Sequence, residues 1–429
     1  MRKDVKIITT LLIAAMLSGC SSKKQRIVVR FMNLEGSQQQ LNIMNIIIRR
    51  FEKENPDIHI EAITGFKPEK IMATIASGSG VDIFHWNNTE DFVDRGAIVN
   101  LNPFVKKYKF DPGILSPIAI KDYTFYKQLY GMPIQINTHG IIFNMDLLTA
   151  KGLELPKEGW DWDDFYNLAL KFKCNKEAGE KGKLKAVSIQ SLMTIPILAS
   201  YGFNGFFDEK TARINEKNHP RFIEILTLYQ KILTTALPSQ EEIAEYQGAT
   251  GYCALFQMGV AAMQFAPAWL LAQLYGIKDF SWDVIEMPGS KRGQKSRGYH
   301  TSAALCLASI SKNQDAAFKF MEFYSRTTSQ KIYGSGKNGL PANIEAAKFT
   351  FRKPPEHISL YLKMLDANNL RLPRYKNSKE YSDRLMPHTY NFLKGEISPE
   401  TYIKRIEETG KTLLEPYPAD FLDDKPVFE

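Results

Sequence analysis

The sequence predicts an α/β protein of two domains, each built on a doubly wound, mainly parallel sheet. Three observations predict this class. Apolar runs typical of buried strands alternate with amphipathic helical stretches over residues 26–86. Polar residues and glycine follow the ends of these runs. The chain of 429 residues is long enough for two domains, since one domain commonly holds about 100–200 residues.

The first elements are expected in the order strand, helix, strand, helix, strand. Their predicted bounds are 27–31, 38–54, 58–63, 67–77 and 81–86. The first helix is predicted because its apolar residues share one face, at Leu41, Met44, Ile47, Ile48 and Phe51. Sheets of this kind bind ligands at the carboxyl ends of their strands. The loops at 33–37 and 86–88 should therefore open on one edge.

The middle of the chain predicts a passage between the two domains. Residues 130–144 resemble one long extended segment with a polar step at 135–139. Helices are expected at 145–151 and 163–172, the second capped by Asp161 or Asp163. An exposed polar loop at 179–185 precedes a strand at 186–189.

The N-terminus predicts a processed leader. Arg2, Lys3 and Lys6 precede an apolar run at 8–17, which is too short to span a bilayer because about 20 apolar residues are needed. The run closes on Leu17-Ser18-Gly19-Cys20, which resembles the processing box of bacterial lipoproteins. The resemblance implies a signal peptide at 1–19, acyl chains on Cys20 and a polar tether at 20–25. A signal peptide that merely ends near a cysteine is the alternative.

Composition excludes some classes of partner and site. The net charge of +8 is mild, residues 1–19 contribute +2 of it, and no dense basic block with aromatics appears, so nucleic acid is not expected. No HExxH, zinc-ligand or GxSxG pattern is present, so we expect no metal, cofactor or catalytic residue. Gly334-Ser335-Gly336-Lys337 lacks the first glycine of a phosphate loop. Of Cys174, Cys253 and Cys306 at most one pair can bridge, and we expect buried, apolar thiols.

Five groups of residues follow one another along the chain in a recognisable order. They are 56–58 with 75–78 and 82–84; 129–133 with 142–148; 159–165; 256–263 with 267–269; and 338–342. Together they resemble the extracellular solute-binding protein family 1, the sugar-binding subunits of ABC importers, to which maltose-binding protein is related. The resemblance covers nearly all of the mature chain.

The resemblance implies a two-lobe periplasmic-binding-protein fold, hinge-linked, with the ligand held in a cleft. The chain is expected to cross first at Gln135–Gly140, to return just before Val284, and to cross again near 325–329. Lobe 1 is then 26–136 and 284–327, and lobe 2 is 137–283 and 328–429. Trp160 and Trp162 are expected to cap and pack a helix rather than to contact ligand.

Sugar sites need planar polar groups for hydrogen bonds and aromatic rings for stacking. In lobe 1 the candidates after the first and third strands are Glu35, Trp86 and Asn87. The alternatives for these three are a solvated carboxylate, core packing and an ordinary turn residue. Asn88 is a weaker candidate, and Asp82 should order the strand end.

The remaining candidates lie in the crossing strand, after the strand at 186–189, in the second lobe and just before the apolar run at 303–308. They are Asn137, Gln190 (with Ser191 beside it), Trp269, Tyr299 and His300. Trp269 in Pro267-Ala268-Trp269 resembles the second-lobe cleft tryptophan of the maltose-binding relatives.

The leading functional hypothesis is a monomeric, non-enzymatic binding lipoprotein. It captures a sugar or oligosaccharide and presents it to ABC permease subunits at the outer face of the cell membrane or in the periplasm. A lipid-anchored carbohydrate hydrolase is an alternative, which needs two carboxylates about 5–10 Å apart, with Glu35 and Glu286 not excluded. A sugar-sensing lipoprotein for a receptor kinase is another.

Overall fold

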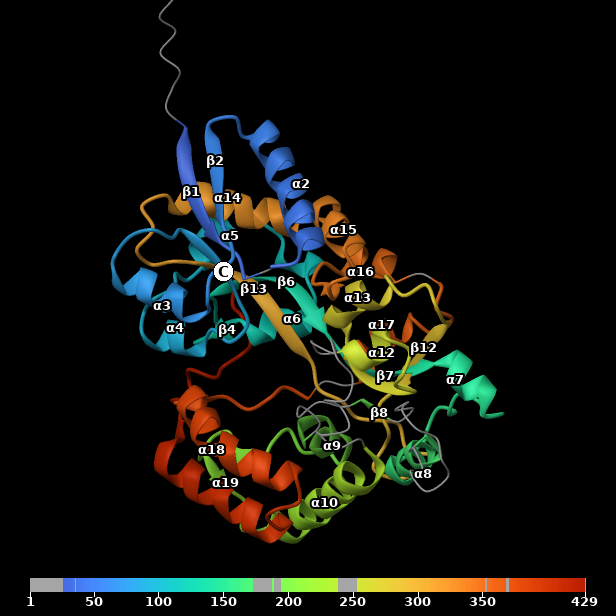
Figure 1. Ribbon diagram of the computed structural model, residues 1–429. Helices are drawn as coiled ribbons and strands as arrows, with labels where there is room; N and C mark the ends of the chain where they lie inside the picture. The colour runs from blue at the N-terminus through green and yellow to red at the C-terminus, as the bar shows by residue number, and fades with distance from the viewer. Residues whose placement is uncertain are drawn as a thin grey trace, which may run out of the picture.

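The protein forms two lobes, each built on one sheet with helices on both faces (Figure 1). The computed structural model describes residues 26–34, 36–172, 187–188, 194–237, 253–351, 353–367 and 370–428. The predicted signal peptide, Cys20 and the predicted tether lie outside the described residues, as do Glu35, Cys174 and Gln190.

The sheet of lobe 1 has the strand order β14-β6-β13-β3-β1-β2. These strands are β1 (Ile27–Met32), β2 (Ile58–Ile63), β3 (Ile83–Trp86), β6 (Gly131–Asn137), β13 (Thr301–Leu307) and β14 (Leu340–Pro341). β1 pairs in parallel with β2 and β3, whereas β13 pairs antiparallel with both β3 and β6. β6 therefore runs in the direction of β1, β2 and β3, and β13 is inserted between β3 and β6 in the opposite direction.

The central strands of lobe 1 are buried on both faces, whereas the edge strand β2 alternates between buried and exposed residues. Phe31 of β1 and Leu305 of β13 join the core beneath one face, and Met32 and Cys306 join the core beneath the other. The helices around this sheet are α2 (Gln38–Glu54), α3 (Glu69–Ala76), α4 (Glu90–Asp94), α5 (Asn102–Tyr108), α6 (Pro117–Asp122), α14 (Gln314–Ser325), α15 (Thr327–Ser335) and α16 (Ile344–Thr350). A small hairpin joins β4 (Thr124–Phe125) to β5 (Gln128–Leu129).

The sheet of lobe 2 has the order β12-β7-β11-β8. Its strands are β7 (His139–Asn144), β8 (Val187–Ser188), β11 (Met263–Pro267) and β12 (Trp282–Glu286). β11 and β12 both pair antiparallel with β7, and β8 pairs in parallel with β11. Each sheet is thus mainly parallel in strand direction. In lobe 1, β13 and the short strand β14 run against the other four strands, and in lobe 2 the entering strand β7 runs against the other three.

The helices of lobe 2 bury both faces of its sheet. Ile141 and Phe265 belong to one core, and Ile142 and Ala266 belong to the core on the opposite face. The helices are α7 (Met145–Ala150), α8 (Trp162–Phe172), α9 (Thr194–Ser200), α10 (His219–Lys231), α12 (Ala254–Gln257), α13 (Leu271–Leu274), α17 (Leu360–Ala367), α18 (Ser378–Leu393) and α19 (Pro399–Leu413). Two short ribbons accompany them, β9 (Phe207–Asp208) with β10 (Arg213–Ile214), and β15 (Tyr375–Lys376) with β16 (Glu415–Pro416).

The crossings between lobes differ in part from the predicted boundaries. β6 ends at Asn137 and β7 begins at His139, within the predicted crossing at 135–140. The return at 284 is wrong, because β12 pairs with β7 in lobe 2 and the chain re-enters lobe 1 only between Met287 and Thr301. The crossing at 327/328 is also wrong. α15 packs on α2, and β14 pairs with β6, so lobe 1 extends to about residue 350.

The final segment also returns to lobe 1. The Tyr126 amide donates to the Phe421 carbonyl (3.2 Å), and the Val427 amide donates to the Lys127 carbonyl (3.0 Å). Tyr417 and Phe421 complete the core beneath α3 and α4. The prediction that 328–429 belongs wholly to lobe 2 therefore holds only for about 360–413.

Several local predictions are confirmed by the structure. The first helix spans Gln38–Glu54 with Ser37 as its cap, and Asp82 orders the strand end by accepting from the Arg30 amide (2.8 Å) and the Ser311 hydroxyl (2.5 Å). Cys253 and Cys306 are buried and free.

Two buried histidines make stability depend on pH. Burial lowers the pKa of both His85 and His139 from 6.5 to about 4. Kept neutral in the folded state, these histidines contribute fully to the unfolding free energy above pH 6.5. This contribution is lost as the pH falls from 6.5 toward 4, because over that range the two histidines bind protons only in the unfolded chain. Each should change the unfolding free energy by up to about 1.4 kcal/mol per pH unit. Urea unfolding between pH 7.5 and 4.5 should show a shallower fall for His139→Gln than for wild type. Equal slopes would contradict the assignment.

Candidate functional site

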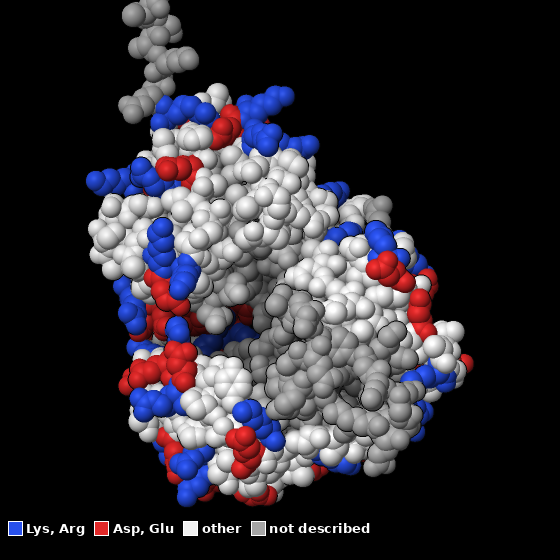
Figure 2. All heavy atoms as spheres, in the orientation of Figure 1, with Lys and Arg blue, Asp and Glu red and all other residues white. Residues whose placement is uncertain are grey.

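Most strands of both sheets end toward the hinge, whereas β7, β13 and β14 begin there. β1, β3 and β6 end at one edge of the lobe 1 sheet. β11 and β12 end where Pro267 pairs with His139 and Glu286 pairs with Gly140, at the start of β7. Figure 2 shows the surface hollowed between the lobes, with acidic and basic side chains at the back of the hollow. The candidate site is the space between these two edges.

Trp86 and Asn87 lie on the lobe 1 side of this space. Trp86 is the last residue of β3, pairs with Ala304 of β13 and is half-buried, with Phe92 packed edge-on at 5.6 Å between ring centroids. Asn87 and Asn88 follow it and are exposed. The tryptophan is thus supported on one side and partly open.

Trp269 occupies the corresponding place on lobe 2. It lies in the short turn Ala268–Leu270 directly after β11, and the Ala268 amide donates to the Thr138 carbonyl (3.0 Å). Its ring is half-buried against a cluster that includes Ile142 and Ala266. The two predicted tryptophans therefore follow strand ends at the facing edges of different lobes.

Asn137 is more enclosed than the sequence indicates. It is 5% exposed, and its Oδ1 accepts from Gln135 Nε2 (3.4 Å), which also donates to the Asn338 carbonyl (2.5 Å). A Cβ atom at Gly339, whose φ is +98°, would lie 2.6 Å from Asn137 Oδ1. Asn137 and Gln135 thus hold the 338–342 motif against β6, which only glycine permits.

Tyr299 belongs to the hinge itself. Its ring stacks on His139 at 4.2 Å, and His139 stacks on Phe265 at 5.3 Å. His139 Nδ1 contacts the Tyr299 carbonyl at 3.1 Å, which assigns the ring proton to that nitrogen. The stack joins the outgoing strand, the returning segment and β11, so Tyr299 stabilises the crossing.

His300 is part of a buried polar cluster in lobe 1. Its Nε2 lies 3.1 Å from Asp122 Oδ2, which also accepts from the Ser302 hydroxyl (2.5 Å). Burial alone would raise the pKa of Asp122, but the hydrogen bond from His300, its charge, Arg374 and Ser302 outweigh it, so the pKa lies below the usual range. The carboxylate is held ionised.

Arg374 carries this cluster across to lobe 2. Its Nε lies 2.7 Å from Glu90 Oε1, and its guanidinium donates to the Asp122 carbonyl. The side chains of Arg374 and Glu90 are only 8% and 15% exposed. Burial raises the pKa of Glu90 and the charge of Arg374 opposes that rise. The backbone amide of Arg374 is held from lobe 2, by Glu209 Oε1 at 2.9 Å.

Successive side chains of residues 374–376 point in opposite directions, so this segment contacts both lobes. Arg374 and Lys376 both reach lobe 1, where they meet Glu90 and Asp94, one helical turn apart on α4. The intervening Tyr375 points to lobe 2 and donates to the Phe207 carbonyl (2.7 Å). We call residues 370–376 the interlobe strap.

Several polar atoms in and around the strap could form further hydrogen bonds. Among the described residues, Thr89 Oγ1, His300 Nδ1, Arg371 Nη1 and Arg374 Nη1 are buried and have no hydrogen-bond partner. Buried polar groups are normally paired, so such atoms need a ligand or solvent partner. The strap was not predicted, because its charged partners are far apart in the sequence and no local pattern marks them.

Two tryptophans and one acid have structural roles. Trp160 and Trp162 are 4% and 1% exposed, which confirms their predicted packing role. Glu286 Oε1 accepts from the Gly159 amide (3.2 Å), and the Glu286 carbonyl accepts from Trp160 Nε1 (2.9 Å). Burial raises the pKa of Glu286. Its carboxylate therefore braces the loop before α8.

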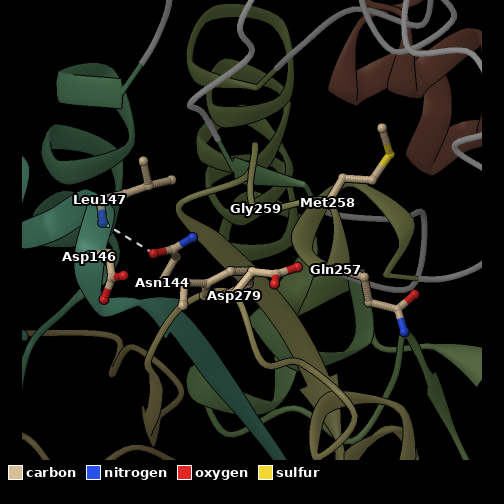
Figure 3. Close-up of a pocket in the computed structure, with 8 residues that line it drawn as sticks. Asn144, Asp146, Leu147, Gln257, Met258, Gly259 and Asp279 are labelled. Carbon is tan, nitrogen blue, oxygen red and sulfur yellow. Dashed lines mark hydrogen bonds between the residues drawn. The ribbon is translucent and has the colours of Figure 1, made fainter.

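A cavity of about 330 Å³ lies elsewhere, on lobe 2 (Figure 3). It is lined by Asn144, Asp146, Leu147, Gln257, Met258, Gly259, Asp279 and Phe280. Asn144 ends β7 at the edge away from the hinge and caps α7 through the Leu147 amide (3.1 Å). None of the predicted site residues lines this cavity, so it is not the candidate site.

The described part of the chain offers neither a metal-binding cluster nor a membrane-spanning helix. No cluster of three or more histidine, cysteine, aspartate or glutamate side chains there could hold a metal ion. No helix there has the length and apolar character needed to cross a membrane.

Two hinged α/β lobes with facing strand ends define the class of two-lobe binding proteins. Residues 36–331 match the bacterial extracellular solute-binding protein family, and the chain belongs to that family. The family is extracellular and consists of solute-binding proteins. The resemblance inferred from the five groups of residues is therefore confirmed.

The individual relatives have low sequence identity to this chain but match most of its length. YcjN of Escherichia coli K12 is 23% identical and covers 75% of this chain and 74% of its own. The multiple sugar-binding protein of Streptococcus mutans is 22% identical and covers 89% and 91%. The structure of the ABC substrate-binding protein Lmo0181 from Listeria monocytogenes, in complex with cycloalternan, has a TM-score of 0.79 at 24% identity and covers 90% and 99%. This likeness confirms the two-lobe fold.

Two substitutions in the strap test how much its ion pairs contribute to the unfolding free energy. Arg374→Met removes the charge partner of a poorly exposed Glu90 and should cost about 3–5 kcal/mol of unfolding free energy. Lys376→Met removes a pair that is about 30% exposed on both sides and should cost at most about 1 kcal/mol. Urea unfolding measures both. Adding Glu90→Leu to Arg374→Met should recover most of the loss, and equal costs for the two single variants would refute the argument.

Proposed function

We propose that this protein binds a sugar or oligosaccharide between its lobes and delivers it to an ABC permease. The main support is the group of unpartnered polar atoms where the lobes meet, at Thr89, His300, Arg371 and Arg374. Hydroxyl groups of a sugar would satisfy both donors and acceptors of this kind. Trp86 and Trp269 would stack on the apolar faces of the sugar rings.

The sugar class is also supported by the relatives. The Streptococcus mutans relative is named a multiple sugar-binding protein, and the structure of Lmo0181 is a complex with cycloalternan. Glu35, Asn87, Asn137 and Gln190 remain proposed contacts at the cleft, although Asn137 would contact ligand only after its present hydrogen bonds are exchanged. The protein is proposed to act as a monomeric, non-enzymatic binding subunit.

The proposed location is the outer face of the cell membrane or the periplasm. The Leu17-Ser18-Gly19-Cys20 box supports lipidation at Cys20. The lipid anchor would keep the protein near the permease while the folded lobes stay in the aqueous phase.

Trp269→Ala should weaken sugar binding strongly. Loss of an aromatic anchor costs on the order of 2–4 kcal/mol, or roughly 30- to 1000-fold in affinity. A thermal-shift screen over di- and oligosaccharides, cycloalternan among them, identifies the ligand, because a ligand at 100 times its Kd adds about 2.7 kcal/mol of stability. Titration calorimetry with that sugar then measures the variant.

Trp282→Ala is the matched control for this experiment. Trp282 is also half-buried in lobe 2, but it pairs with Asn144 at the edge away from the hinge. Its replacement should leave the affinity unchanged. If Trp269→Ala binds as tightly as wild type, or loses stability as a core cavity would, the ring belongs to the core and not to the site.

Cys20→Ala should release the protein from membranes. The mature chain would lose its acyl chains, and its described part has no helix able to span a bilayer. Cell fractionation of the variant and the wild type measures the change. Retention of the variant in the membrane fraction at the wild-type level would overturn the anchor.

A further inference from the structure

One end of lobe 1 carries basic side chains that no internal ion pair uses. They are Arg49, Arg50, Lys53, Lys106, Lys109 and Lys312, which we call the basic pole. All six are exposed, and within the described chain none of them forms a salt bridge. Figure 2 shows Lys and Arg side chains gathered at the end of the molecule where β1 starts.

The fold brings these residues together from three segments. α2 ends beside the start of β2, whose Ile58 pairs with Ile27 at the start of β1. Asn313 Nδ2 donates to the Val28 carbonyl (3.0 Å), which fixes the neighbouring Lys312 at the same end. The end of α5 is tied to the start of α14 by Lys107 Nζ, 2.6 Å from Asp315 Oδ1.

Most acidic side chains of this region already form ion pairs with other basic residues. Glu52 pairs with Arg26 at 3.0 Å, Asp315 pairs with Lys107, and Glu54 pairs with Arg326 at 3.1 Å. Asp57 and Asp111 remain without a salt bridge among the described residues. The basic pole therefore keeps a positive surplus, and a positive surplus on an exposed face attracts anionic partners.

We propose that the basic pole docks on the anionic phospholipid head groups of the membrane. The choice of membrane rests on the proposed function, in which Cys20 carries the anchor. Only five residues lie between Cys20 and Arg26, and the six residue steps from one to the other span at most about 20 Å. The anchor thus holds this pole, and not the cleft, close to the lipid surface.

The pairing of a lipid anchor with a basic patch has a physical reason. The acyl chains on Cys20 would hold the protein at the membrane, and an electrostatic contact would add to this attachment and determine which face of the protein meets the lipid. A Lys or Arg near an anionic surface strengthens binding about fivefold, and the effect fades beyond about 8 Å at physiological salt. The cleft at the opposite edge of lobe 1 is then turned away from the lipid surface until a permease engages it.

Vesicle binding by the unlipidated protein tests the proposal. The chain from residue 20 onward, carrying Cys20→Ser, is mixed with vesicles of phosphatidylcholine alone or with phosphatidylglycerol. Binding is expected only with phosphatidylglycerol and should weaken as salt rises. Arg49→Glu, Arg50→Glu and Lys53→Glu together should weaken it by about 100-fold or more.

A control with the same net charge separates the pole from general attraction. Lys210→Glu, Lys217→Glu and Lys291→Glu change exposed residues of lobe 2 and should reduce binding by less than about threefold. Equal losses in the two triple variants, or equal binding to both kinds of vesicle, would overturn the proposal. Sugar titration of the same proteins reports on the cleft independently, so a failure of sugar binding and a failure of membrane docking are distinguishable.

Discussion

The architecture depends on one buried residue, Thr138, at which a single extended strand passes from one sheet into the other. Asn137 pairs with Thr301 in lobe 1, and His139 pairs with Pro267 in lobe 2. Thr138 is fully buried, its hydroxyl donates to the Tyr361 carbonyl (2.9 Å), and its carbonyl accepts from Ala268. Because both sheets share this strand, their carboxyl edges must face each other across the hinge. The candidate site lies between those two edges.

The contacts between the lobes differ in kind with their distance from this strand. The stack of Phe265, His139 and Tyr299 is apolar in character and lies close to the pivot, where a rotation displaces atoms little. The interlobe strap lies farther out, and there the lobes meet through charges, Arg374 with Glu90 and Lys376 with Asp94. Buried ion pairs demand accurate geometry, so they favour one relative placement of the lobes over others.

Local features of the fold were predictable from the sequence, and long-range ones were not. Helical periodicity gave the bounds of Gln38–Glu54, and strand alternation gave Ile58–Ile63. The apolar run at 284–286 is equally compatible with either sheet, because a buried strand carries no mark of its partner, and the boundary there was misplaced. The same holds for α15 and β14, whose membership in lobe 1 depends on contacts with α2 and β6.

The residues of the candidate site also divide into those that a local sequence pattern marks and those that only the tertiary fold brings together. Trp86 and Trp269 could be proposed as ligand contacts because aromatic residues at or just after a strand end are visible in the sequence. Tyr299 and His300 could be proposed in the same way, and in the structure Tyr299 stacks at the hinge and His300 belongs to a buried polar cluster. Arg374 and Asp122 are 252 residues apart, so their encounter follows only from the tertiary fold.

The return of the final segment to lobe 1 has a practical consequence for watching the protein move. β1 starts on lobe 1, and Val427 is hydrogen-bonded to Lys127 on the same lobe. Fluorophores fused at the two termini would therefore travel together, and their energy transfer would stay constant however far the lobes rotate. A reporter of closure needs one dye inserted in lobe 2, for example at the turn between α18 and α19, where Gly395 has a positive φ and the chain already bends.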